Sequence, residues 1–217
     1  VEIGDVLEIH TPVRVNDEKR ETRILEAAKD ALYAWHILFV HTDGAGDPDR
    51  ALAERVEPAI QRIFDEMGGE KRHGVAVLPV RETEAWCLVD GDALRKAIGV
   101  LRDDAFLGLP EKPADVEKLI DPKKALNDAC LKAISKKRRK RRGQKGADFL
   151  DQIGEFVSLE KLDEVPAFQM LNMELHNALT FLGYLDRHPS THKSIFRPSR
   201  NPLSGIVMRD GIQRQDG

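Results

Sequence analysis

Two short apolar runs constrain the fold of this chain most strongly, because each ends in a turn that carries acidic residues. The first run is 37–41, and Asp43 and Asp47 follow it; the second is 75–80, and Glu84 follows it. Short β-branched runs bounded by helical patterns and Gly turns are typical of buried parallel strands. In open α/β sheets, ligands bind beyond the carboxyl ends of such strands. We therefore expect the two acidic turns to meet at one edge of a sheet.

Strand-like and helical patterns alternate over about the first hundred residues. Residues 6–15 alternate apolar and polar side chains, which predicts an edge strand, and apolar residues at helical spacing predict helices at 18–35 and 48–67. Asp90 is placed to cap a further helix that ends near Gly99. This alternation predicts an α/β fold with a mostly parallel sheet flanked by helices.

The second half of the chain has helical patterns and few strand signals. We expect three parts: an α/β domain at 1–100, a helical extension at 101–186 and a loosely ordered tail at 187–217. The helical patterns of the extension cover 115–119, 122–135, 147–157 and 166–182.

Composition bears on the cellular location of the protein and the state of its thiols more than on its function. The 34 basic and 37 acidic residues nearly balance, so net charge alone points to no partner. Cys87 and Cys130 stand far apart, without the spacing of a metal site or a redox pair, and we interpret them as reduced, packed thiols. The sequence shows no apolar run of membrane-spanning length and no signal peptide, which favours a cytoplasmic protein. Because the chain starts at Val1 rather than Met, we expect a truncated or processed N-terminus.

The acidic turns suggest a site for a hard cation. Asp43, Asp47 and Glu84 would crowd at one sheet edge, where their repulsion is relieved by a divalent ion, and oxygen ligands favour Mg²⁺ or Mn²⁺ over zinc. The alternatives are local roles: Asp43 capping its turn, Asp47 capping a helix, and Glu84 in the first turn of a helix. His41 is either a further ligand or a structural histidine.

A dense basic block stands in the helical half. It would bind phosphate backbones without reading sequence; the alternatives are contact with an acidic partner protein and a solvated loop. Its eight basic residues, which we predict to bind nucleic acid, are Lys136, Lys137, Arg138, Arg139, Lys140, Arg141, Arg142 and Lys145.

Two segments resemble a known family. HTDGAGDPDRA (41–51) and VLPVRETEAWCLVDGDAL (77–94) resemble the signature segments of the Toprim-like family known as domain of unknown function 4276. The wider Toprim group contains topoisomerases, primases and nucleases, including phage-defence nucleases, that bind Mg²⁺ and act on phosphodiesters. The resemblance implies a Toprim-like (Rossmann-like) fold, with Asp43, Asp47 and Glu84 as metal ligands at the same edge.

From this resemblance and the basic block we expect a metal-dependent nuclease or related phosphodiester-cleaving enzyme, with Asp43 and Glu84 catalytic and Mg²⁺ or Mn²⁺ as cofactor. The early glutamate of the family has no clear match here, because Glu8 lies in a strand-like segment without the expected Gly turn. The alternative is therefore a non-catalytic Toprim-like subunit of a multi-protein defence complex, binding nucleic acid or a partner such as an ATPase. A nucleotide-handling phosphatase would use the same carboxylates.

Overall fold

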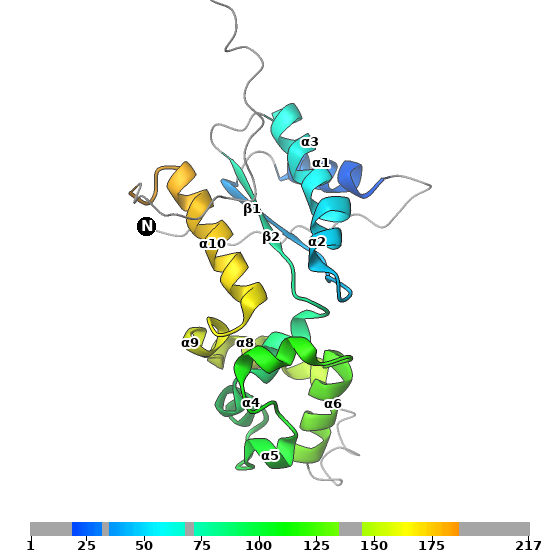
Figure 1. Cartoon of the computed structure of the whole chain (residues 1–217), viewed down its shortest axis with the longest axis vertical. Helices are drawn as coiled ribbons and strands as arrows, with labels where there is room; N and C mark the ends of the chain where they lie inside the picture. The colour runs from blue at the N-terminus through cyan, green and yellow to red at the C-terminus, as the bar shows by residue number, and fades with distance from the viewer. Residues whose placement is uncertain (1–18, 32–34, 68–71, 135–144, 187–217) are drawn as a thin grey trace, which may run out of the picture.

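The computed structural model describes residues 19–31, 35–67, 72–134 and 145–186. Within them the chain is mixed α/β, with two parallel strands packed between helices and a helical body below them in the view of Figure 1. The α/β class predicted from the sequence is thus confirmed. The Toprim-like assignment stays a prediction, and the edge strand expected at 6–15 lies outside the described residues.

The sheet consists of β1 (Ile37–His41) and β2 (His73–Val77), paired in parallel from Ile37 opposite His73 to His41 opposite Val77. The first strand has the predicted bounds, whereas the second begins and ends earlier than the predicted 75–80. The prediction that both strands are buried is wrong for β1, since only Val40 is fully buried there and Phe39 is 50% exposed. Among the described strands β1 has one neighbour, which leaves part of it open to solvent.

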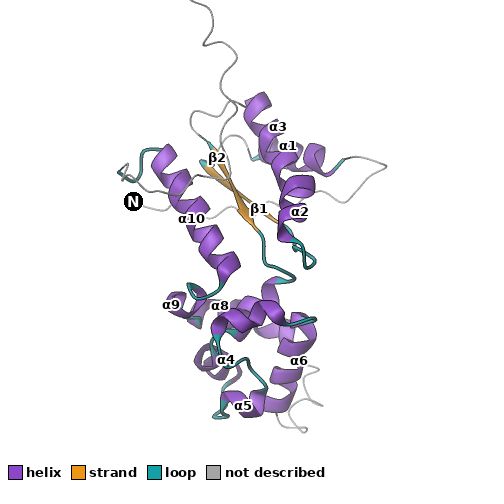
Figure 2. Cartoon of the chain, viewed as in Figure 1, coloured by secondary structure: helices purple, strands orange, loops and turns teal. Residues whose placement is uncertain are grey.

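Helices lie on both sides of the sheet. The crossover from β1 to β2 runs through α2 (Pro48–Ala51), a π-helical segment η1 (Leu52–Val56) and α3 (Glu57–Met67). This crossover and α1 (Arg20–Asp30) lie on one side of the strands, and α10 (Pro166–Phe181) lies on the other (Figure 2). The core of this part is Ile24, Leu25, Ala28, Trp35, Val40, Leu52, Val56, Ala59, Ile60, Ile63 and Ala76.

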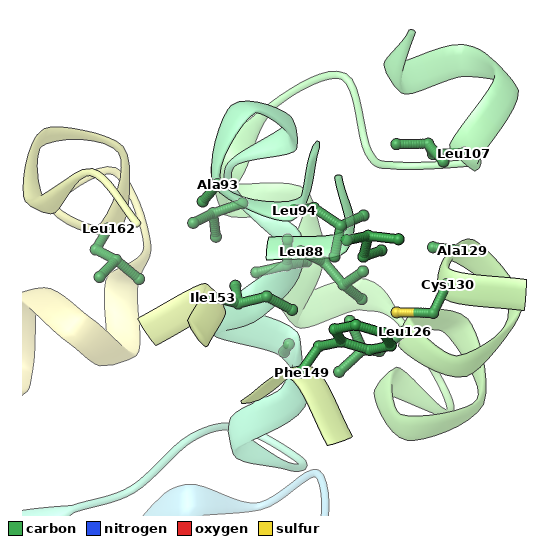
Figure 3. Close-up of a cluster of buried hydrophobic side chains, with 14 of the residues drawn as sticks. Leu88, Ala93, Leu94, Leu107, Leu126, Ala129, Cys130, Phe149, Ile153 and Leu162 are labelled. Carbon is green, nitrogen blue, oxygen red and sulfur yellow. The ribbon is translucent and has the colours of Figure 1, made fainter. Parts of the chain in front are cut away.

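The helical body has a separate core, shown in Figure 3. Its elements are η2 (Thr83–Leu88), α4 (Gly91–Ile98), α5 (Asp104–Leu107), η3 (Pro113–Lys118), α6 (Pro122–Ala133), η4 (Gly146–Phe149), α8 (Leu150–Phe156) and α9 (Leu159–Leu162). Leu94, Leu126 and Ile153 are buried in its centre. The core already includes Ala85, so the helical packing begins before residue 100, and α10 returns to contact β2.

Aspartates cap α4, α5 and α6, and the cap of α4 by Asp90 was predicted from the sequence. Asp90 is the clearest case: its Oδ1 accepts hydrogen bonds from the amides of Asp92 and Ala93, which would otherwise lack partners at the start of α4. Asp90 also accepts from Lys161 Nζ at 2.7 Å and from the Ser158 amide at 3.1 Å, so one buried carboxylate joins α4 to α9.

Those contacts set the charge state of Asp90. Burial alone would raise the pKa of its carboxyl group, but the hydrogen bond from Lys161 and the Ser158 amide outweigh burial, and the pKa lies below its ordinary value. The carboxylate is therefore held ionised in the folded protein.

Candidate functional site

The loops that follow the two strands lie side by side, as parallel topology requires. The Thr42 amide donates to the Val77 carbonyl at 3.1 Å, Gly44 to Pro79 at 2.9 Å, and Gly46 to Val80 at 2.8 Å. These bonds continue the ladder of β1 and β2 past the ends of the strands. We call this double loop, residues 41–47 and 78–84, the rim.

Glycine allows the close approach of the two loops. A Cβ atom on Gly44 would lie 2.7 Å from the Val80 carbonyl oxygen and 2.8 Å from that of Pro79, closer than real Cβ contacts. Gly46 has φ of +89°, in the region that favours glycine, and Ala45 before it has φ of 51°. The Gly-rich turn is thus explained by backbone packing, and its two glycines set the path of the Asp43–Asp47 segment.

Asp43 is exposed to solvent at the rim. Its side chain is 52% exposed, and its Oδ1 lies 3.6 Å from His41 Nε2. The same His41 atom is 2.9 Å from the hydroxyl of Thr83, the first residue of η2. His41 therefore links the end of β1 to the segment that carries Glu84, which is the structural role that the sequence left open.

Three arginines, two beside the rim and one within it, gather there, and the sequence analysis missed them. Arg20 donates to the His41 carbonyl at 2.9 Å and to the Thr42 hydroxyl at 3.2 Å, and Arg55 donates to the Asp43 carbonyl at 3.4 Å. The guanidinium of Arg81 lies over Gly46, 3.6 Å from where a Cβ would stand. A pattern search could not find this cluster, because its members come from α1, η1 and the loop after β2.

Arg20 and Arg55 are close enough to affect one another. The pKa of Arg20 is lowered, first by burial and then by the positive charges of Arg55 and Arg23, while Asp43 opposes the shift. Positive charges held close together repel one another, and a bound anion relieves that repulsion. The arginines thus favour an anion at the part of the rim where they lie, and the rim also carries the carboxylates of Asp43, Asp47, Glu82 and Glu84.

Asp47 and Glu84 both have partners within the protein. Asp47 Oδ1 accepts from the Arg50 amide at 3.0 Å, so this residue caps α2. The Glu84 side chain is 15% exposed, and its Oε1 is 3.6 Å from Lys123 Nζ at the start of α6. The amide of Lys123 in turn donates to Glu82 at 3.0 Å. Both local roles considered from sequence, a cap and a first-turn glutamate, are therefore present.

These contacts bear on the predicted metal. Within the residues that the structure describes, no group of three or more His, Cys, Asp or Glu side chains is placed to hold a metal ion. Asp43 is open, but Asp47 caps a helix and Glu84 contacts a lysine. Among the described residues these three carboxylates thus form no assembled Mg²⁺ or Mn²⁺ site, and their metal-binding and catalytic roles stay predictions.

The basic block contributes little to the described structure. Lys136, Lys137, Arg138, Arg139, Lys140, Arg141 and Arg142 lie outside the described residues, so their predicted contact with nucleic acid stays a prediction. Lys145 is described: it is exposed, and its amide donates to Asp148 at the start of η4.

The two cysteines are free thiols, as predicted. Burial raises the pKa of Cys87 and that of Cys130 to about 12, which keeps both protonated and poorly nucleophilic. They are part of the helical core rather than of a reactive site.

Comparison with protein-family models, with curated proteins and with solved structures finds no match to this chain. Across the described ranges, no helix is both long enough and apolar enough to cross a lipid bilayer. The case for a function therefore depends on the geometry of the rim and on the sequence.

Proposed function

We propose that the protein binds the phosphate backbone of a nucleic acid at the rim, with the basic block as a second contact. The observation that carries this proposal is the convergence of Arg20, Arg55 and Arg81 on the loops beyond β1 and β2. Guanidinium groups suit phosphate oxygens in charge and geometry, and the carboxyl ends of parallel strands are where α/β folds bind ligands.

The basic block supports the same class of ligand. Eight basic residues within 136–145 attract any polyanion, with an affinity that falls steeply as salt is added. An acidic partner protein would also be attracted to the block, but the arginines of the rim lie in a loop-lined setting that suits single phosphate groups. Two separate cationic features are most simply explained by an extended phosphodiester strand.

A second candidate is metal-dependent cleavage of the bound strand, as in a Toprim-like nuclease of phage defence. The observation in its favour is Asp43, a half-exposed carboxylate beside His41 at the edge of the arginine cluster. The engaged states of Asp47 and Glu84 weigh against it and favour the alternative of a non-catalytic subunit, alone or with a partner protein such as an ATPase.

Binding is tested by fluorescence anisotropy of labelled single- and double-stranded DNA and RNA over a series of salt concentrations. Arg55→Gln and Arg81→Gln should each weaken binding several-fold for all sequences, and each should reduce the slope of log K against log salt by about 1. The matched control is Lys118→Gln, which removes an 80% exposed cation paired with Asp115 on η3 and should change neither quantity. Equal effects of the rim variants and the control would refute binding at the rim.

Cleavage is tested in the same samples by adding Mg²⁺ or Mn²⁺ and following the length of the strand. Loss of a metal-dependent product in Asp43→Asn, with binding retained, would establish the nuclease. Tight binding without cleavage of the strand, in the presence of either Mg²⁺ or Mn²⁺, would support the non-catalytic alternative.

A further inference from the structure

A pocket behind the rim is distinct from the arginine cluster. It has a volume of about 200 Å³ and lies between the end of β2, the start of the crossover and the first turns of α10. Nine of its lining residues are apolar and three are acidic: Pro48, Leu52, Ala76, Leu78, Val80, Pro166, Ala167, Met170 and Leu171, with Asp49, Glu117 and Glu174. This mixture of apolar walls and a few polar groups is typical of sites for small organic ligands.

The size of the pocket selects ligands with one ring or a short branched chain. An apolar cavity of about 150 Å³ in another protein stays dry and takes up benzene. The pocket here, at about 200 Å³, has room for such a body and a short polar tail.

The charged residues that line the pocket determine which charge a ligand should carry. None of the described residues that line it is basic, and Glu174 is only 3% exposed. Glu117 Oε1 accepts from the Ala167 amide at 2.8 Å, which fixes this carboxylate at the first turn of α10. Carboxylates in an apolar setting repel phosphates and attract ammonium groups, so the pocket does not extend the anion site of the rim.

We propose that this pocket binds a small organic amine, with its apolar body against Leu52, Leu78 and Leu171 and its ammonium group at Glu117. The apolar body gains by leaving water, and the ammonium group gains a charge-assisted hydrogen bond to the carboxylate. The pocket differs from the proposed nucleic-acid contact in its charged residues, which are acidic rather than basic, although Leu78 and Val80 of the rim form part of its wall.

Three probes of one shape test the proposal on the full chain: 2-phenylethylamine, neutral 2-phenylethanol and anionic 3-phenylpropanoate. Binding is followed by the NMR shifts of the methyl groups of Leu52, Leu78, Met170 and Leu171. The amine should shift these signals with a Kd tighter than about 1 mM, at least about tenfold tighter than the alcohol, and the anion should not bind. Equal binding of amine and alcohol, or no shift by any probe, would overturn the proposal.

Two variants locate the site. Glu117→Gln keeps an oxygen that can accept from the Ala167 amide but removes the charge. It should therefore weaken the affinity for the amine by about tenfold and leave the affinity for the alcohol unchanged. Ala167→Leu fills the pocket and should abolish binding of both the amine and the alcohol. The control is Glu160→Gln on α9, an exposed glutamate outside the lining, which should change nothing. If Ala167→Leu does not fold, the charge test with Glu117→Gln decides alone; an unchanged amine affinity there refutes the assignment.

Discussion

Replacing Gly44 by alanine tests the packing that forms the rim. The added Cβ would meet the backbone oxygens of Val80 and Pro79 at 2.7 and 2.8 Å, so one loop must move away from the other. That movement breaks the bonds from Gly44 to Pro79 and from Gly46 to Val80. At about 0.5–1.5 kcal/mol for each hydrogen bond, we expect the free energy of unfolding to fall by about 1–3 kcal/mol.

The matched control is Gly154→Ala in α8, where an added Cβ meets nothing within 4 Å. Alanine favours a helix interior over glycine by about 1 kcal/mol, so the same chemical change should stabilise the protein. Both variants are measured by urea unfolding, followed by circular dichroism, with the midpoint and slope fitted separately.

The nucleic-acid assay gives Gly44→Ala a second readout. Separation of the loops displaces the Asp43 carbonyl that Arg55 contacts, so binding should weaken along with stability. A Gly44→Ala protein with unchanged unfolding midpoint and unchanged binding would refute the reasoning that this glycine holds the loops together.

Three further changes have expected outcomes. Ala45→Gly removes a strained positive φ of 51° and should raise the free energy of unfolding by at most about 1 kcal/mol; an unchanged or lower value would contradict this. Asp90→Asn should cost about 1–3 kcal/mol at pH 7, measured by urea unfolding. Because the folded pKa of Asp90 is depressed, its stabilisation is present above the ordinary value of 3.8 and is lost as pH falls through the folded pKa. The variant should therefore lose less stability than wild type on acidification below about pH 4, and parallel pH curves would argue against the charge. Leu126→Ala, in the helical core with 1% exposure, should lower the unfolding free energy by about 2–5 kcal/mol, and a loss below 1 would mean that this core is loosely packed.

Local structure was largely predictable from sequence, because local chemistry sets it. Asp90 and Gly99 mark the two ends of α4 as expected: the carboxylate bonds the first free amides, and the glycine adopts the left-handed φ of +74° that ends a helix. The side-by-side approach of the two loops also followed, since parallel strands must end at the same edge.

The side-chain partners of the site were not predictable. Glu84 contacts Lys123, and Arg20 and Arg55 reach the rim from separate helices, so these contacts depend on how distant elements pack. Phe39 illustrates the same limit for burial: its apolar run predicted a covered strand, but coverage depends on neighbours that periodicity does not count.

Lys123 joins the start of α6 to the segment that follows β2. Its amide and its ammonium group contact Glu82 and Glu84, which adds polar contacts to the apolar packing of α6 against η2. Any cation or ligand that draws Glu84 towards itself must compete with this lysine at the start of α6. By reciprocity, a partner that shifts α6 changes the affinity of that carboxylate for its ligand, so the junction can transmit occupancy in both directions.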